Sequence, residues 1–199
     1  MGATAGNAEL IILVTALGYA VYLLKRRRAF TLPGGIVLSI LLGSLAVTLL
    51  LEDVAVLKTE TGPMTLGYAG LLFFALAFGE TAGITAGIGL GAGEYLLRGD
   101  PNWAAASLIA SMAAGGLAGF IGRGGEEFST ALLGAVLGGS VYVIFMYTYL
   151  RIVTGVGYSD ALSMLAPVVS SVTTAVILGV GLLLTVRKWE KWPGPLEGS

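Results

Sequence analysis

The sequence contains no cysteine and no histidine, and only 12% of its 199 residues are charged. These absences exclude disulfides, thiolate and imidazole metal ligands, cysteine nucleophiles and Ser/His/Asp triads. Carboxylates paired for acid–base chemistry are also missing from the apolar segments, so we expect neither an enzyme nor a bound metal or cofactor. The net charge is −1, and no basic cluster is interleaved with aromatic residues, which argues against nucleic-acid binding.

Apolar residues make up 56% of the chain. A spanning helix needs about 20 mostly apolar residues, with a range of about 17 to 25. Several apolar runs approach or reach that length, at approximately 8–24, 33–51, 63–79, 82–97, 103–122, 130–150 and 161–186. The sequence therefore predicts an all-α, polytopic membrane helix bundle of about seven transmembrane helices, placed as a multi-pass protein in the cell membrane with the lipid bilayer as its first partner.

The stretch 63–97 is too long for one membrane span. As a single helix it would measure about 52 Å, against a hydrocarbon core of about 30 Å. Gly79-Glu80-Thr81 lies near its middle and is the expected turn, so the stretch divides into two short spans. A re-entrant pair of half-helices is the alternative.

Basic residues are distributed unequally between the two sides that seven crossings define. Eight of them fall on one side and three on the other, Lys58, Arg98 and Arg151. By the positive-inside rule the richer side is cytoplasmic, which puts the N-terminus outside and the C-terminus inside. Trp103 and Tyr158 then fall at the outer interface. The eight on the cytoplasmic side are Lys25, Arg26, Arg27, Arg28, Arg123, Arg187, Lys188 and Lys191.

Three segments follow from these patterns. Residues 1–30 form an N-terminal transmembrane helix with a basic cytoplasmic loop, because the first apolar run lacks the cleavage site of a signal peptide. Residues 31–188 form a six-helix, glycine-rich membrane domain. Residues 189–199 are polar and rich in proline and glycine, so they are expected to be a cytoplasmic tail or linker.

Glycines recur at every fourth position in the middle of the chain, which leaves bare backbone along one helix face. Such a face lets another helix approach closely. The pattern is explained by helix packing alone, although close backbones also allow a compact pocket or a sliding interface. The predicted packing residues are Gly79, Gly83, Gly87, Gly91, Gly115 and Gly119.

Two acidic positions stand out among the apolar runs, since a carboxylate in the bilayer centre costs about 2.5 to 3.5 kcal/mol on insertion scales. Glu80 falls at the predicted turn. Its charge is explained there if it is a solvated loop residue or a neighbour of a helix N-cap. Glu94 lies four residues before Arg98, a spacing that favours an ion pair on one helix face. That pair is either structural or part of a ligand site.

The segment Gly99-Asp100-Pro101-Asn102-Trp103 predicts a turn followed by a helix start, with Asp100 or Asn102 as the cap. As an outer loop that includes Trp103 it is a candidate lid over a binding site. Turn chemistry alone explains it equally well.

The last apolar run is dense in hydroxyl groups and contains Pro167, which frees a backbone carbonyl and predicts a kink. Serine and threonine in membrane helices often bond only to their own helix. The functional alternative is a cavity lined by Ser163, Ser170 and Thr174 together with Tyr147 and Tyr149.

The order of these features resembles the multi-span receptor domain of LytS/YhcK-type sensor proteins. The resemblance rests on Gly-Glu-Thr-Ala-Gly-Ile-Thr-Ala-Gly-Ile-Gly-Leu-Gly-Ala-Gly-Glu-Tyr-Leu-Leu-Arg-Gly-Asp (79–100) and Ala-Ala-Gly-Gly-Leu-Ala-Gly-Phe-Ile-Gly-Arg (113–123). It continues weakly through Ala166-Pro167. Two positions depart from the family pattern, Gly79-Glu80 in place of Gly-Pro and Glu94-Tyr95 where an Arg precedes the aromatic, so Arg98 would replace that Arg one turn later.

The same stretch is similar to the S components of energy-coupling-factor transporters, whose six helices would correspond to the second to seventh runs. We therefore predict a non-catalytic, membrane-embedded receptor or sensor module that binds an unknown small-molecule ligand from the outside and passes a signal to a cytoplasmic signalling domain. The alternative is an S component, docked on a transporter subunit, or a solitary carrier. A third interpretation is a structural subunit of a larger membrane complex.

Overall fold

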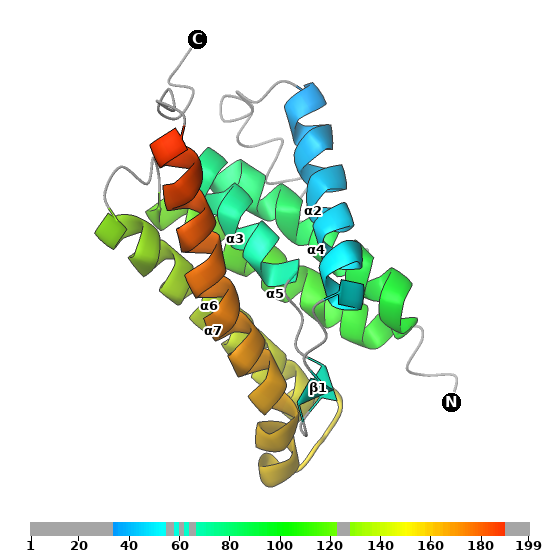
Figure 1. The fold of residues 1–199 in the computed structure, drawn as a ribbon. Helices are drawn as coiled ribbons and strands as arrows, with labels where there is room; N and C mark the ends of the chain where they lie inside the picture. Colours follow the sequence, from blue (N-terminus) through cyan, green and yellow to red (C-terminus); the bar gives the residue numbers. More distant parts are fainter. Residues whose placement is uncertain (1–33, 55–57, 60–61, 64–66, 123–127, 190–199) are drawn as a thin grey trace, which may run out of the picture.

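Six α-helices form the part of the chain that the computed structural model describes, residues 34–54, 58–59, 62–63, 67–122 and 128–189. Their succession matches the last six predicted apolar runs, and the helices alternate in direction (Figure 1). The predicted N-terminal helix and the C-terminal tail beyond Trp189 lie outside the described residues. The helices are α2 (Gly34–Val54), α3 (Gly67–Phe78), α4 (Glu80–Arg98), α5 (Pro101–Ile121), α6 (Phe128–Thr148) and α7 (Tyr158–Trp189).

A two-stranded β-hairpin and a π-helical turn lie at one end of the bundle, which we call the hairpin end (Figure 1). Strands β1 (Lys58–Thr59) and β2 (Gly62–Pro63) pair antiparallel, with Lys58 opposite Pro63 and Thr59 opposite Gly62. The π-helical turn η1 (Tyr149–Val153) extends α6 toward the same end, where α7 then begins.

The structure confirms the predicted break in the stretch 63–97. Helix α3 ends at Phe78 and α4 begins at Glu80, while Gly79 between them has φ 87°. Glycine adopts this positive φ without the steric cost that a side chain would add, so the chain can reverse with a single linking residue.

The turn between α4 and α5 follows its predicted chemistry. Gly99 ends α4 in the left-handed conformation, with its N–H donating to the carbonyl of Tyr95. Asp100 is the cap of α5, because its carboxylate accepts hydrogen bonds from the backbone N–H groups of Asn102 at 2.9 Å and Trp103 at 3.3 Å. Pro101 occupies the first helical position, where its missing N–H has no intrahelical partner to lose.

Helix α3 lies at the centre of the bundle and contacts every other described α-helix. Around it α2 contacts α4, α4 contacts α5, α5 contacts α6, and α6 contacts α7. At 12 residues α3 is about 18 Å long, less than the hydrocarbon thickness of about 30 Å. Leu71, Leu72 and Ala75 of α3 have no exposed surface, so the core of the bundle is built on this short helix.

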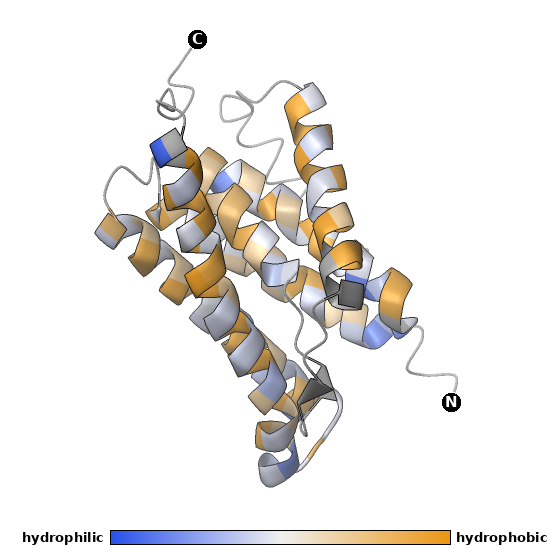
Figure 2. Cartoon of the chain, in the orientation of Figure 1, coloured by the Kyte–Doolittle hydropathy of each residue, from blue (hydrophilic) through white to orange (hydrophobic). Residues whose placement is uncertain are grey.

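Three of the described helical segments are long and apolar enough to cross a membrane: Pro101–Ile121, Phe128–Val153 and Tyr158–Val186. Large apolar side chains point outward from α6 and α7, among them Ile144, 61% exposed, and Ile177, 68% exposed. Figure 2 shows apolar colours along the helices, with the strongest hydrophilic colours near their ends. These features suggest a multi-pass helical membrane protein. The count of seven spans and the orientation of the termini stay predictions.

Candidate functional site

Backbone meets backbone along the interface between α4 and α5. A Cβ added to Gly83 would overlap the carbonyl of Gly115, and one added to Gly115 would overlap the carbonyl of Gly83. A Cβ on Gly87 would lie 2.7 Å from backbone atoms of Ser111, and one on Gly91 would lie 2.7 Å from the Cα of Leu108. These glycines therefore leave no space for a ligand along this interface.

The same packing continues on both sides of these two helices. On α5, a Cβ at Gly119 would lie 2.5 Å from the backbone of Gly79. On α6, a Cβ at Gly138 would lie 2.7 Å from the carbonyl of Ala114. On the opposite face of α4, Gly93 leaves room for Thr48 of α2. Helices α2, α4, α5 and α6 thus form one closely packed layer.

Polar side chains occur at every fourth residue in the first half of α5, at Trp103, Ser107 and Ser111. The hydroxyl of Ser111, which has one proton to donate, lies within hydrogen-bond distance of the carbonyl of Gly87, at 3.1 Å, and of the carbonyl of Ser107. The hydroxyl of Ser107 lies 3.1 Å from that of Tyr142 on α6, within hydrogen-bond distance. Each of these groups is satisfied by a neighbouring helix or by its own helix, which fits a role in holding the layer together.

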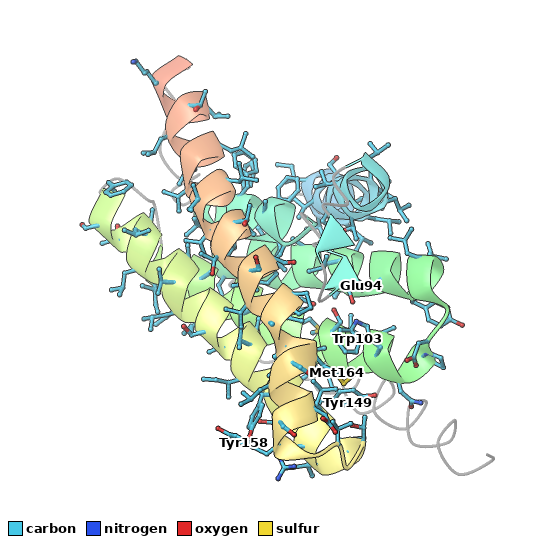
Figure 3. The ribbon with its side chains drawn as sticks, turned by 60° about the horizontal axis from the view of Figure 1, so that its bottom comes forward. Glu94, Trp103, Tyr149, Tyr158 and Met164 are labelled. Carbon is cyan, nitrogen blue, oxygen red and sulfur yellow. The ribbon has the colours of Figure 1, made fainter. Side chains whose placement is uncertain are left out.

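Glu94 and Trp103 meet at the end of the α4–α5 interface (Figure 3). The indole Nε1 of Trp103 donates to Oε2 of Glu94 at 2.8 Å, and the Glu94 side chain is only 3% exposed. Sequence reasoning paired Glu94 with Arg98, but the side chain of Arg98 lies outside the described part of the structure. The contact with Trp103 nine residues away could not be read from helical spacing, because it depends on how the turn folds back.

Tyr68, at the start of α3, places a polar atom in the core. Its side chain is 3% exposed, its ring lies 4.9 Å from that of Tyr142 between centroids, and its hydroxyl has no hydrogen-bond partner among the described residues. A buried polar group left unsatisfied costs about 1 to 3 kcal/mol. Tyr68 is therefore a destabilising feature inside an otherwise well-bonded cluster.

Replacing Tyr68 by phenylalanine is expected to raise the stability of the protein by up to about 1 kcal/mol, because the unsatisfied hydroxyl is removed while the ring contact stays. The measurement is thermal or denaturant-induced unfolding of the detergent-solubilised protein. Tyr142→Phe is the matched control, because it removes the hydroxyl that pairs with Ser107, and it should lower stability by about 1 kcal/mol. Loss of stability in both variants alike would show that Tyr68 has a partner in the membrane.

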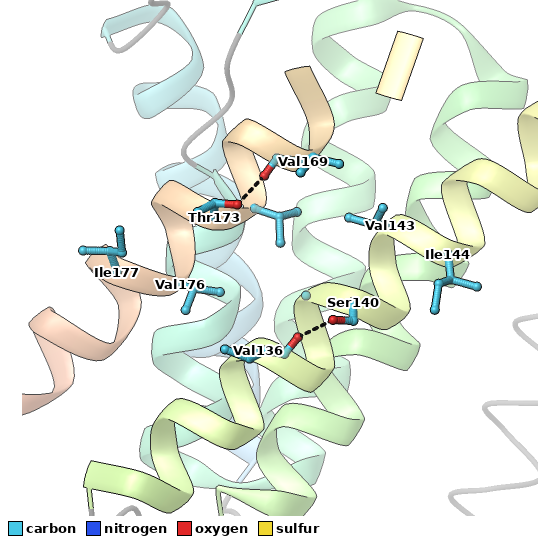
Figure 4. A pocket seen from close by; sticks show the side chains of 10 residues that line it. Val136, Ser140, Val143, Ile144, Val169, Thr173, Val176 and Ile177 are labelled. Carbon is cyan, nitrogen blue, oxygen red and sulfur yellow. Dashed lines mark hydrogen bonds between the residues drawn. The ribbon is translucent and has the colours of Figure 1, made fainter. Parts of the chain in front are cut away.

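Two cavities lie between α6 and α7, on the outer side of the bundle. One has a volume of about 490 Å³ and is lined by aliphatic side chains together with Ser140 and Thr173 (Figure 4). The other, of about 730 Å³, is lined by Tyr147, Tyr158 and Ser170 as well as aliphatic residues. Both hydroxyls of the first cavity donate to their own helix, Ser140 to Val136 at 2.9 Å and Thr173 to Val169 at 2.8 Å.

The larger cavity brings together Tyr147 and Ser170 from the predicted ligand-binding set. The other members lie elsewhere. Ser163 is exposed and donates to the carbonyl of Asp160 at 2.8 Å, whereas Tyr149 belongs to η1 and packs against the core. Thr174 is half-buried on α7 and does not line either cavity.

The cavity-lining residues that sequence reasoning missed are Tyr158 and a row of residues on each helix, all of them β-branched except Ser140. On α7 the row is Val169, Thr173 and Ile177, four residues apart, and on α6 it includes Val136, Ser140 and Ile144 at the same spacing. That spacing was a usable signal, because residues four apart share a helix face. It could not separate a groove from an ordinary lipid-facing surface.

The described fold is all-α with three candidate membrane spans, which suggests a helical multi-pass membrane protein, and a lateral groove lies between its last two helices. The chain matches no known family model, no curated protein and no solved structure.

Proposed function

We propose that the protein is a non-catalytic, membrane-embedded module that binds a small molecule and acts as a receptor. The observation that carries the proposal is the cavity of about 730 Å³ between α6 and α7, lined by Tyr147, Tyr158 and Ser170. Small-molecule sites typically measure about 300 to 1,000 Å³ and combine an apolar lining with a few polar groups. Two phenols and a serine hydroxyl on a wall of valine, leucine, isoleucine and alanine fit that description.

The packing around α7 supports the receptor role. Helices α2, α4, α5 and α6 approach one another closely at glycines, while α7 packs on α3 and leaves the two cavities between itself and α6. Pro167 lies inside α7 and removes one of its backbone hydrogen bonds. A ligand that favours one position of α7 would shift that helix against the closely packed layer, and α7 is the last described helix before the C-terminal segment.

Resemblance to LytS/YhcK-type receptor domains agrees with this direction of signalling, from a membrane site through the last helix to a cytoplasmic partner. The transport alternative is favoured by one observation, the six α-helices of the described residues, which is the number expected of an S component. The two functions differ in what the ligand does. A receptor holds it, and a carrier moves it across the bilayer.

Filling the larger cavity tests the proposal. Val169 lines both cavities, so Val169→Trp places a large ring where the ligand is expected. We expect native mass spectrometry of the protein purified from membranes to show a co-purified small molecule on the unmodified protein, reduced about tenfold in Val169→Trp. Leu182→Trp is the control, because Leu182 is an exposed apolar residue of α7, 50% exposed against 44% for Val169, and lines neither cavity.

A co-purified molecule that persists in Val169→Trp would contradict the assignment of the site. Absence of any molecule beyond bulk lipid on the unmodified protein would contradict ligand binding itself. To separate receptor from carrier, the protein is reconstituted in sealed vesicles with the identified molecule in radiolabelled form. Saturable binding without accumulation in the lumen supports the receptor, and accumulation that Val169→Trp abolishes supports the carrier.

A further inference from the structure

The two cavities between α6 and α7 form one groove. They share Val143 and Ile144 on α6 and Val169 on α7. The lining on α7 runs from Tyr158 to Ile177, which corresponds to about 28 Å at a rise of 1.5 Å per residue. This length approaches the thickness of the hydrocarbon core, about 30 Å.

One end of the groove is apolar. Its walls are the side chains of valine and isoleucine. Its floor is the point where α6 and α7 come close together, at Gly139 and Val172. A Cβ added to Gly139 would lie only 2.6 Å from Cγ1 of Val172. Ser140 and Thr173 line this part, but both hydroxyls donate to carbonyls of their own helices. An occupant of this half therefore needs no polar groups.

The other end, at the hairpin end of the bundle, is amphipathic. Tyr147 precedes η1, and Tyr158 is the first residue of α7, so both phenols lie close to the loop that joins the two helices (Figure 3 shows Tyr158 there). Ser170 adds a hydroxyl further along α7. Tyrosine with an apolar ring and a polar tip is typical of the membrane–water interface. The polarity of the groove thus changes along its axis in the same direction as that of a bilayer leaflet.

The groove also opens sideways. Ile144, Val169 and Ile177, which line it, are exposed by 61%, 44% and 68% of their surfaces. Both flanking helices belong to the three segments long and apolar enough to span a membrane. In a bilayer, this opening faces the hydrocarbon region rather than water.

From this polarity we infer the ligand class of the proposed site. The geometry points to a single-chain amphiphile, such as a fatty acid or fatty alcohol, that enters from the bilayer with its chain against Val143, Ile144 and Val169 and its head group at Tyr147 and Tyr158. The inference rests on the proposed function, because it assigns a ligand to the same cavity. Two facing helices provide one apolar channel, which accommodates one chain of the ligand.

Photo-crosslinking in vesicles tests this assignment. The protein is reconstituted in phosphatidylcholine vesicles with palmitic acid that carries a mid-chain diazirine, illuminated, digested and mapped by mass spectrometry. We expect saturable adducts on α6 and α7 near Val143 and Val169, suppressed by excess unlabelled palmitic acid. Val169→Trp should lower the adduct yield about tenfold, and Leu182→Trp should leave it unchanged. Tyr158→Phe should raise the probe concentration needed for half-maximal labelling roughly two- to tenfold, the effect of losing one hydrogen bond.

Three other results would overturn the inference. Labelling spread evenly over exposed apolar faces such as Leu38 and Leu42 of α2, or not suppressed by palmitic acid, would show bulk lipid only. Equal, saturable labelling by a diazirine-bearing phosphatidylcholine would assign the groove to a two-chain membrane lipid. A water-soluble molecule found by native mass spectrometry and displaced in Val169→Trp would refute the amphiphile while leaving the receptor proposal intact.

Discussion

Gly83→Ala is expected to be among the most damaging single-methyl changes in this protein. The added Cβ would overlap the carbonyl oxygen of Gly115 and lie 2.9 Å from the Cβ of Ala75. Backbone on one side and the central helix α3 on the other leave the methyl group nowhere to move. Overpacking of a core costs about 1 to 3 kcal/mol even where side chains can adjust, so a loss on the order of 3 kcal/mol or more is expected here.

The measurement is the free energy of unfolding in mixed detergent and denaturant, followed by helical circular dichroism. Gly181→Ala is the matched control, because no atom lies within 4 Å of a Cβ added to Gly181 in α7. Alanine is favoured over glycine in a helix interior by about 0.5 to 1 kcal/mol in water, so this variant should be neutral or slightly more stable. A Gly83→Ala variant as stable as Gly181→Ala would contradict the backbone contact between α4 and α5.

The apolar runs predicted the succession of helices, and glycine positions predicted two of the turns and one face of close helix packing. Gly79 and Gly99 marked the ends of α3 and α4, because a chain reversal needs a positive φ that glycine adopts freely. The four-residue spacing of Gly83, Gly87 and Gly91 indicated a face of close approach, but the pattern has the same form whichever helix is the partner. That α5 packs on this face, with Gly115 opposite Gly83, is a property of the tertiary fold.

The central position of α3 was also beyond the reach of sequence. Its apolar residues are as hydrophobic as those of a lipid-facing helix, and hydrophobicity does not distinguish burial in protein from burial in lipid. Conversely, α4 contains Glu80, Glu94 and many glycines, and it is nevertheless sheltered because α2, α3 and α5 contact it. The candidate groove illustrates the same limit, since Val169 and Ile144 would have the same spacing on a smooth lipid-facing surface.

Trp103→Phe is expected to lower the free energy of unfolding by about 1 to 3 kcal/mol, the range for removing the partner of a buried hydrogen-bonding group. The indole Nε1 lies 2.8 Å from Oε2 of Glu94, a side chain that is 3% exposed, so water cannot readily replace the lost donor. Phenylalanine retains an aromatic ring at this position. The loss should therefore report mainly the missing N–H, and it is measured by the same unfolding titration.

A double-mutant cycle distinguishes this bond from ring packing. In a Glu94→Leu background the carboxyl is gone, so Trp103→Phe should cost much less than it does in the unmodified protein. Glu94→Gln is the conservative control, because its amide oxygen still accepts from the indole, and it should preserve most of the coupling. If Trp103→Phe costs the same in both backgrounds, the indole acts only through its packing. The Glu94–Trp103 hydrogen bond would then make no contribution of its own to holding the turn at Gly99-Asp100.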